Sequence, residues 1–143
     1  MADAVAGIET KEFTLEIVTP QRSVFSGLVQ SFNVPGTMGG FEVLRDHAPL
    51  LATIGVGPVK LVDGDGNETF FATSGGFVQV ENNYAVFLAD SAERKDEIDV
   101  GRAQAARTRA AERIERKESE TDLKRARAAL ARAINRLKVA EVL

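Results

Sequence analysis

The composition of the chain changes abruptly near residue 92. All four prolines, all the aromatic residues and every glycine except Gly101 lie before this point, whereas the rest of the chain is rich in alanine, arginine and glutamate. Alanine, arginine and glutamate favour helices, while glycine and proline interrupt them. The sequence therefore predicts two domains of different secondary structure, which span residues 1–92 and 93–143.

The first domain is predicted to consist of short β-strands. Apolar and polar side chains alternate in several stretches, and alternation with a period of two is typical of half-buried strands. These stretches are residues 13–17, 32–34, 59–61, 78–80 and 85–89. Residues 63–67 read Asp-Gly-Asp-Gly-Asn, which favours a tight turn between two strands. Closely spaced strands with no helix between them favour a sandwich or a barrel.

The second domain is predicted to contain two helices. The first runs from Asp96 to about Lys117, and Asp96 or Asp99 is suited to cap its first turn. In the second helix, leucine recurs every seven residues and alanine follows each leucine by three positions, at Leu123, Leu130, Leu137, Ala126, Ala133 and Ala140. Such a narrow apolar seam indicates a partner helix.

The apolar pattern stops between the two helices, around residues 118–121. Ser119 or Thr121 is suited to cap the second helix there. A short connection between two helices, the second of which has a seam that expects a partner helix, favours an antiparallel hairpin. The predicted fold is therefore mainly β plus α, with an N-terminal β-sandwich followed by a C-terminal antiparallel two-helix hairpin.

The two domains carry opposite net charge. Residues 1–92 hold 4 basic and 11 acidic side chains, a net charge of −7, and residues 93–143 hold 14 basic and 10 acidic ones, a net charge of +4. An acidic body with a basic arm predicts that the arm meets an anion, an acidic protein surface or its own body.

With no cysteine and one histidine, neither disulfides nor a metal site are expected. No apolar run approaches the ~20 residues of a spanning helix, and residues 1–10 lack a signal pattern, so we expect a soluble protein.

Several short motifs follow one another in a specific order. They are residues 13–20 (Phe-Thr-Leu-Glu-Ile-Val-Thr-Pro), 35–36 (Pro-Gly), 39–41 (Gly-Gly-Phe), 47–51 (His-Ala-Pro-Leu-Leu), 75–78 (Gly-Gly-Phe-Val) and 132–137 (Arg-Ala-Ile-Asn-Arg-Leu). In these motifs and their spacing, nearly the whole chain resembles the epsilon subunit family of bacterial F-type ATP synthases. The resemblance implies a noncatalytic rotor-stalk subunit with a β-sandwich and a two-helix hairpin.

The same resemblance implies partners and a location. The subunit would bind the gamma subunit and the membrane c-ring, and its extended hairpin would inhibit ATP hydrolysis by contacting an acidic region of the catalytic beta subunit. It would be peripheral to the membrane through the complex, at the cytoplasmic face of the bacterial inner (plasma) membrane. A chloroplast relative is the lesser alternative.

The resemblance also implies an ATP site in the hairpin. Family members that bind ATP carry an Ile/Leu-Asp-x-x-Arg-Ala motif, which this chain matches at Ile98, Asp99, Arg102 and Ala103. Further matching positions are Glu93, Arg109, Arg132 and Arg136. An antiparallel hairpin that turns near residue 120 sets the four arginines in two levels roughly 10 Å apart. This spacing suits a triphosphate, whose oxygens match the planar fork of arginine.

We interpret ATP as a regulatory ligand that stabilises the folded-down hairpin, with Mg²⁺ as a candidate companion ion, and we expect no required cofactor. The resemblance implies that Asp99 accepts a hydrogen bond from the adenine amino group while Ile98 and Ala103 contact the base. The chain has no Gly-Lys-Ser/Thr phosphate loop, so binding is expected without hydrolysis. The alternative is that the arginines form a solvated face, paired at helical spacing with Glu112, Glu115, Glu118 and Glu120.

Residues 35–40 (Pro-Gly-Thr-Met-Gly-Gly) favour a β-turn. The resemblance implies that this region faces the c-ring, with Ser31, Met38 and Phe41 as candidate contacts. The alternative is ordinary packing of a loop and its strands.

Two other classes of function fit part of the sequence. A nucleic-acid-binding hairpin would use the 14 basic residues, but ten acidic residues lie among them and the arm has no aromatic residue for stacking, so no nucleic-acid partner is expected. A small enzyme would need His47, Ser74 or Asp90, and nothing in the sequence brings these residues together. Neighbouring residues in a strand point to opposite faces, so His47 beside Asp46 is interpreted as structural.

Overall fold

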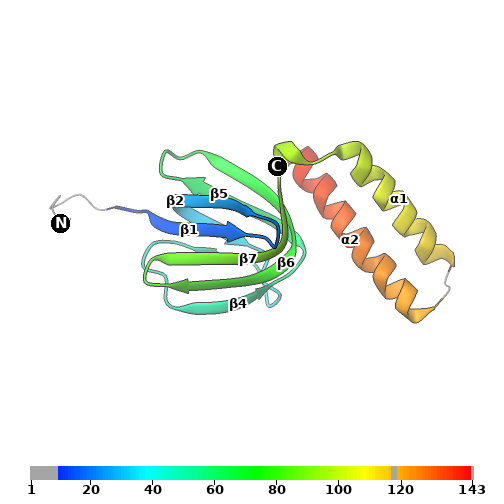
Figure 1. Ribbon diagram of the computed structural model, residues 1–143, viewed down its shortest axis with the longest axis horizontal. Helices are drawn as coiled ribbons and strands as arrows, with labels where there is room; N and C mark the ends of the chain where they lie inside the picture. The colour runs from blue at the N-terminus through cyan, green and yellow to red at the C-terminus, as the bar shows by residue number, and fades with distance from the viewer. Residues whose placement is uncertain (1–9, 117–118, 143) are drawn as a thin grey trace.

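The computed structural model describes residues 10–116 and 119–142, which form a β-sheet domain and two helices at one end of it (Figure 1). The strands are β1 (Phe13–Val18), β2 (Ser23–Val34), β3 (Phe41–Val43), β4 (Leu50–Ile54), β5 (Gly57–Asp63), β6 (Glu68–Glu81) and β7 (Tyr84–Arg94). The 3₁₀ turn η2 (Lys95–Glu97) leads into the helices α1 (Val100–Arg116) and α2 (Glu120–Val142). The predicted fold, a β-sandwich followed by an antiparallel two-helix hairpin, is confirmed.

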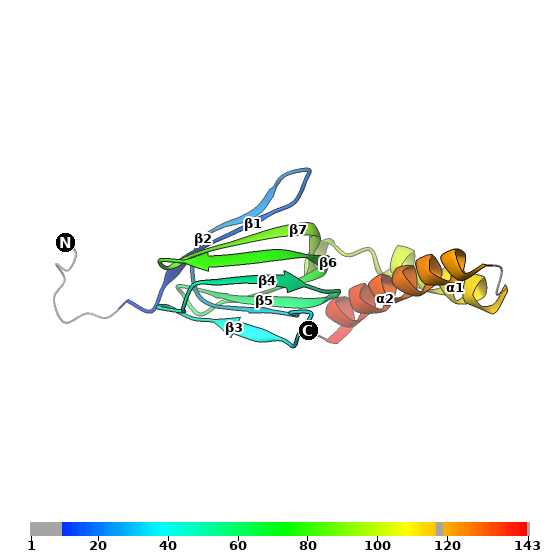
Figure 2. The same cartoon turned by 90° about the horizontal axis from the view of Figure 1, so that it is seen from below.

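The strands form one hydrogen-bonded sheet that folds over into a sandwich. Its order is β1-β7-β6-β5-β2-β3; in addition, β4 pairs with β6 and β1 pairs with β2, which closes the sheet on itself. Strand β1 runs parallel to β7, and the other pairings of named strands are antiparallel. The hairpin projects from one end of this sandwich (Figure 2).

Strand β6 changes its partner at a glycine bulge. Its first half, residues 68–73, pairs with β5, and residues 76–80 pair with β4. Gly75 and Gly76 adopt φ angles of 125° and 144°, which residues with a Cβ rarely adopt. A Cβ on Gly76 would collide with the carbonyl group of Leu88 on β7. The bulge therefore allows one strand to serve both layers, next to the end that faces the hairpin.

An apolar core fills the sandwich. Three of its largest fully buried side chains are Phe32, Phe71 and Phe87, from β2, β6 and β7. The ring centroids of Phe32 and Phe87 lie 6.1 Å apart, within the range of favourable aromatic pairs. The alternation predicted for residues 13–17 is confirmed, because buried and half-buried residues alternate along β1.

The helices pack against each other through small side chains. Ala103 and Ala110 of α1 and Ala126 and Ala133 of α2 are buried. Alanine lets two helix backbones approach closely. The apolar seam of the sequence therefore meets a partner helix, as predicted.

The first helix begins later than predicted. It starts at Val100 and not at Asp96, because the Asp99 Oδ1 atom accepts the backbone N–H of Arg102 at 3.0 Å and caps the helix. Ile98 is extended and only 9% exposed, a placement that a helix beginning at Asp96 would not give. In α2 the cap is Ser119, whose Oγ accepts the N–H of Asp122 at 3.1 Å.

A second face of α2 docks the hairpin onto the sandwich. The Asn135 side chain is buried, and its Nδ2 donates to the carbonyl oxygens of Gly57 at 2.9 Å and Thr73 at 3.3 Å. Four residues further along the helix, Val139 is fully buried against Ala72 of β6. The Asn135 anchor, a small apolar contact and an ion pair between Arg136 of α2 and Glu93 of β7 thus join the two domains.

Asp46 and His47 lie in the segment between β3 and β4, so the expectation that they belong to a strand was wrong. Asp46 has a φ of 65°, and its backbone N–H donates to Asn83 Oδ1 at 2.6 Å. The Nδ1 atom of His47 lies 2.7 Å from the carbonyl oxygen of Ala48. Both residues stabilise a turn, which agrees with a structural role for His47.

Candidate functional site

A cavity of about 550 Å³ lies between the sandwich and the hairpin. Its wall combines the β1–β2 turn, the ends of β6 and β7 beside the glycine bulge, and one face of each helix. The lining residues are Thr19, Gln21, Arg22, Val24, Ala72, Thr73, Ser74, Ser91, Ala92, Glu93, Ala106, Ala129, Arg132, Ala133, Asn135 and Arg136. This volume is within the range of small-molecule sites in proteins.

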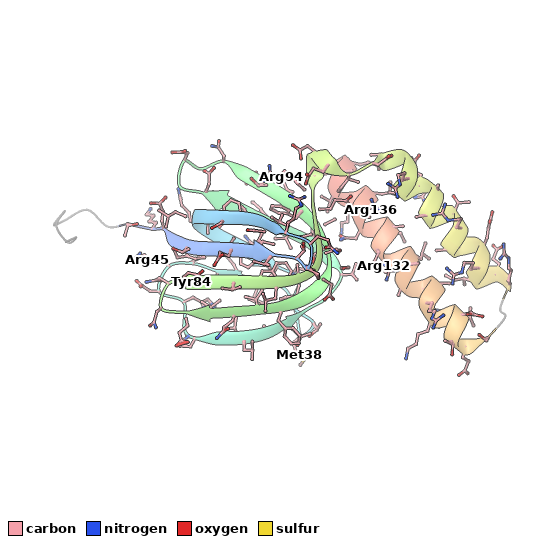
Figure 3. The ribbon with its side chains drawn as sticks, in the orientation of Figure 1. Met38, Arg45, Tyr84, Arg94, Arg132 and Arg136 are labelled. Carbon is pink, nitrogen blue, oxygen red and sulfur yellow. The ribbon has the colours of Figure 1, made fainter. Side chains whose placement is uncertain are left out.

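Three of the eight predicted ATP-binding residues meet at this cavity. Arg136 of α2 donates from Nε to Glu93 Oε1 at 2.7 Å and from Nη2 to Glu93 Oε2 at 3.1 Å. Both side chains are about one-third exposed, at 29% and 34%. Arg132 lies one turn before Arg136 and lines the same space, and Figure 3 shows both arginines where α2 meets the sandwich. The Arg136 guanidinium group is thus held by a planar two-point contact with a carboxylate.

Arg102 and Arg109 lie on the exposed surface of α1 and do not line the cavity. Ala106, which is four residues after Arg102 and three before Arg109, does line it. Residues at these spacings share one helix face. The two arginines therefore arise from the helix face that borders the cavity.

The other three motif residues have structural roles in this conformation. Asp99 caps α1, Ile98 is buried beside Val139, and Ala103 is fully buried between the helices. None of them lines the cavity. Their roles toward the adenine ring remain a prediction.

Several residues that the sequence did not assign to this site also border it; Ser74 among them was considered only for a small enzyme. Arg22 enters from the β1–β2 turn, and the hydroxyl groups of Ser74 and Ser91 lie 2.6 Å apart on neighbouring strands. Asn135 anchors α2 beside them. Asn135 could have been predicted from the sequence, because this polar residue lies four positions before Val139 and so shares with it a second face of the helix. Arg22 could not have been predicted, since only the fold brings it to the hairpin.

The three candidate c-ring contacts do not share one surface. Met38 is 99% exposed, and with the half-buried Phe41 it lines a cavity of about 530 Å³ beside β4. Ser31 is buried in β2 and borders a different cavity, together with Arg45. Met38 is thus the most accessible of the three.

Two further properties concern the described residues only. Within residues 10–116 and 119–142, no three His, Cys, Asp or Glu side chains are grouped as a metal site would require. None of the helices described there is long and apolar enough to cross a membrane.

A β-sandwich followed by a two-helix hairpin, with an arginine-lined cavity between them, defines a class of two-domain subunit. Residues 12–95 match the β-sandwich domain of the ATP synthase delta/epsilon chain, and residues 96–141 match the long α-helix domain of the same chain. The chain therefore belongs to the ATP synthase delta/epsilon chain family. The epsilon chain is a noncatalytic subunit of the ATP synthase complex, as the resemblance implied.

Individual relatives agree with this assignment. The chain is 47% identical over 103 residues to the ATP synthase epsilon chain of Pelotomaculum thermopropionicum, a match that covers 72% of this chain and 76% of the relative. It is 47% identical over 127 residues to the epsilon chain of Desulforamulus reducens, with coverage of 89% and 96%.

A solved structure shares the fold. A chain of the Euglena gracilis mitochondrial ATP synthase superimposes with a TM-score of 0.77 at 18% identity, covering 88% of this chain and 79% of that one.

Proposed function

We propose that this chain is a rotor-stalk subunit of an F-type ATP synthase whose hairpin senses ATP. The observation that carries the proposal is the cavity between the sandwich and the hairpin, which Arg132 and Arg136 border with Glu93. Arg102 and Arg109 arise from the adjoining face of α1 without lining the cavity, and we infer that their side chains turn toward it when a polyphosphate is bound. A cluster of arginines repels itself, and a polyphosphate relieves the repulsion.

ATP acts here as a ligand and not as a substrate. It binds the folded-down hairpin and stabilises that state only to the extent that it binds the extended state less tightly. At a concentration 100 times its dissociation constant, a ligand that binds one state alone stabilises that state by about 2.7 kcal/mol. The docking contacts are few, namely Asn135, Val139 and the Arg136–Glu93 ion pair, so we expect a free energy of this size to shift the equilibrium between docked and extended hairpins. Mg²⁺ would accompany the phosphates as a counter-ion.

The released hairpin carries the inhibitory function. Its basic side chains suit an acidic region of the catalytic beta subunit, which would hold the extended hairpin and block ATP hydrolysis. ATP therefore relieves inhibition by keeping the hairpin on the sandwich.

The sandwich supplies the contacts to the rotor. Phe77 of β6 lies opposite Leu88 of β7, and both are more than half exposed, while Leu51 of the neighbouring β4 is 72% exposed. This apolar surface suits the gamma subunit. Met38 and Phe41 suit the c-ring, and we infer a peripheral location for the chain at the cytoplasmic face of the bacterial membrane.

Calorimetric titration of ATP into the purified chain tests the sensor function. We expect saturable one-to-one binding that is absent in the double variant Arg132→Ala/Arg136→Ala and retained in the matched variant Arg125→Ala/Arg127→Ala, whose arginines lie exposed on the same helix. A parallel titration with GTP tests whether binding depends on the adenine base. Absence of ATP binding at millimolar concentration would contradict the sensor proposal and leave the family assignment intact.

A further inference from the structure

One guanidinium group at the cavity belongs to the sandwich. Arg22 comes from the β1–β2 turn, which lies at the hairpin end of the sandwich (Figure 2). It lines the same space as Arg132 and Arg136 of α2. Its side chain is 59% exposed, and its Nη2 atom lies 3.6 Å from Glu97 Oε2. Arginines from both domains therefore border one opening.

The ion pair between Arg22 and Glu97 leaves the arginine available to a ligand. A separation of 3.6 Å between two half-exposed groups is longer than a charge-assisted hydrogen bond, and exposed pairs of this kind contribute little. A phosphate group offers Arg22 two oxygens in its own plane. Glu93 also belongs to the sandwich and is a predicted ATP contact, but its carboxylate cannot donate a hydrogen bond to phosphate oxygens and here pairs with Arg136.

The position of Arg22 has a thermodynamic consequence. A nucleotide held by α1 and α2 alone would travel with the hairpin and would stabilise the hairpin's own fold without favouring docking. A contact to Arg22 exists only while the hairpin lies on the sandwich. Since a ligand shifts an equilibrium only by its difference in affinity for the two states, such a contact is what makes the nucleotide a docking signal.

We propose that Arg22 binds phosphate oxygens of the nucleotide from the sandwich side and thereby couples nucleotide binding to hairpin docking. This inference rests on the proposed ATP site and assigns a further residue to it. Arg22 couples nucleotide binding to docking, while Arg132 and Arg136 bind the nucleotide from the hairpin.

The experiment measures ATP binding and docking in the same full-length chain. The chain has no cysteine, so Asp65→Cys in the β5–β6 turn and Thr121→Cys at the hairpin tip introduce the only two labelling sites. Spin labels there report the distance between the domains with and without ATP, and calorimetry gives the affinity. We expect Arg22→Gln to weaken ATP binding by about tenfold, the loss of one charge-assisted contact, and to abolish the ATP-driven rise in the docked fraction.

Two matched variants separate the mechanism from its alternatives. Glu97→Gln removes the ion pair but keeps Arg22, so it should bind ATP at least as tightly as the unchanged chain. Arg45→Gln removes a different sandwich arginine, far from the cavity, and should change neither readout (Figure 3).

Three results would overturn the proposal. If Arg22→Gln binds ATP and docks like the unchanged chain, Arg22 is not the coupling residue, although the ATP site stands. If Glu97→Gln reproduces the loss seen in Arg22→Gln, the ion pair carries the effect and not a ligand contact. If the unchanged chain does not bind ATP, the proposed function fails, and the role of Arg22 fails with it.

Discussion

Replacement of Asn135 by alanine should release the hairpin from the sandwich without unfolding either domain. The Asn135 side chain is 7% exposed and donates two hydrogen bonds across the domain boundary, to Gly57 and Thr73. Alanine is a better helix former than asparagine, so α2 itself does not weaken. The variant therefore perturbs docking alone.

The size of the effect follows from the two acceptors. Asn135→Ala leaves the carbonyl oxygens of Gly57 and Thr73 without this donor while α2 still covers them, and an unsatisfied buried polar group costs about 1–3 kcal/mol. Undocking lets water reach both oxygens, so the cost falls on the docked state only. We expect the ratio of docked to undocked chains to fall roughly 5- to 150-fold, the equivalent of that free energy.

The distance between labels at Asp65→Cys and Thr121→Cys measures this ratio directly. The matched control is Ile134→Ala, which alters the neighbouring and partly exposed side chain and should leave the ratio almost unchanged. An Asn135→Ala variant with the docked fraction of the unchanged chain would refute the reasoning that a polar anchor holds the hairpin.

Three other predictions address local structure. Asp99→Ala removes the cap of α1 and should destabilise the hairpin by about 1 kcal/mol, seen as a lower helical melting temperature by circular dichroism; an unchanged melt would contradict the capping role. Gly76→Ala should destabilise the sandwich far more than Gly66→Ala in chemical denaturation, because a Cβ at Gly76 meets the Leu88 carbonyl group and one at Gly66 meets nothing; equal losses would contradict this. Hydrogen bonds to Asp63, first from the Asn67 backbone, lower the pKa of that carboxyl group below 3.8. Their small stabilising effect on the folded state is therefore present above pH 3.8 and is lost as the pH falls through the pKa of folded Asp63. An NMR titration of Asp63 with a midpoint at or above 3.8 would disprove it.

The sequence predicted those parts of the structure that depend on local periodicity. Alternation in residues 13–17 identified a strand with one buried face, and the leucine and alanine seam identified the contact of α2 with α1. Both patterns arise because each element presents one face to its neighbour. The start of α1 was placed too early, because the burial of Ile98 against the sandwich is a tertiary effect.

The candidate site was only partly predictable, for the same reason. The motif resemblance identified Glu93, Arg132 and Arg136, which the structure brings to one cavity. Arg22 is distant from them in sequence and reaches the cavity only through the closure of β1 onto β2 and β7. No local pattern contains that information. Asn135 was visible as a polar residue in a helix, but its acceptors on β5 and β6 were not.

In the proposed mechanism, ATP holds the hairpin on the sandwich. The distance between labels at Asp65→Cys and Thr121→Cys, measured in the otherwise unchanged chain as ATP is raised to saturation, reports this directly. We expect the docked fraction to rise with ATP, with a midpoint that matches the calorimetric dissociation constant. Saturable ATP binding with no change in the docked fraction would contradict it.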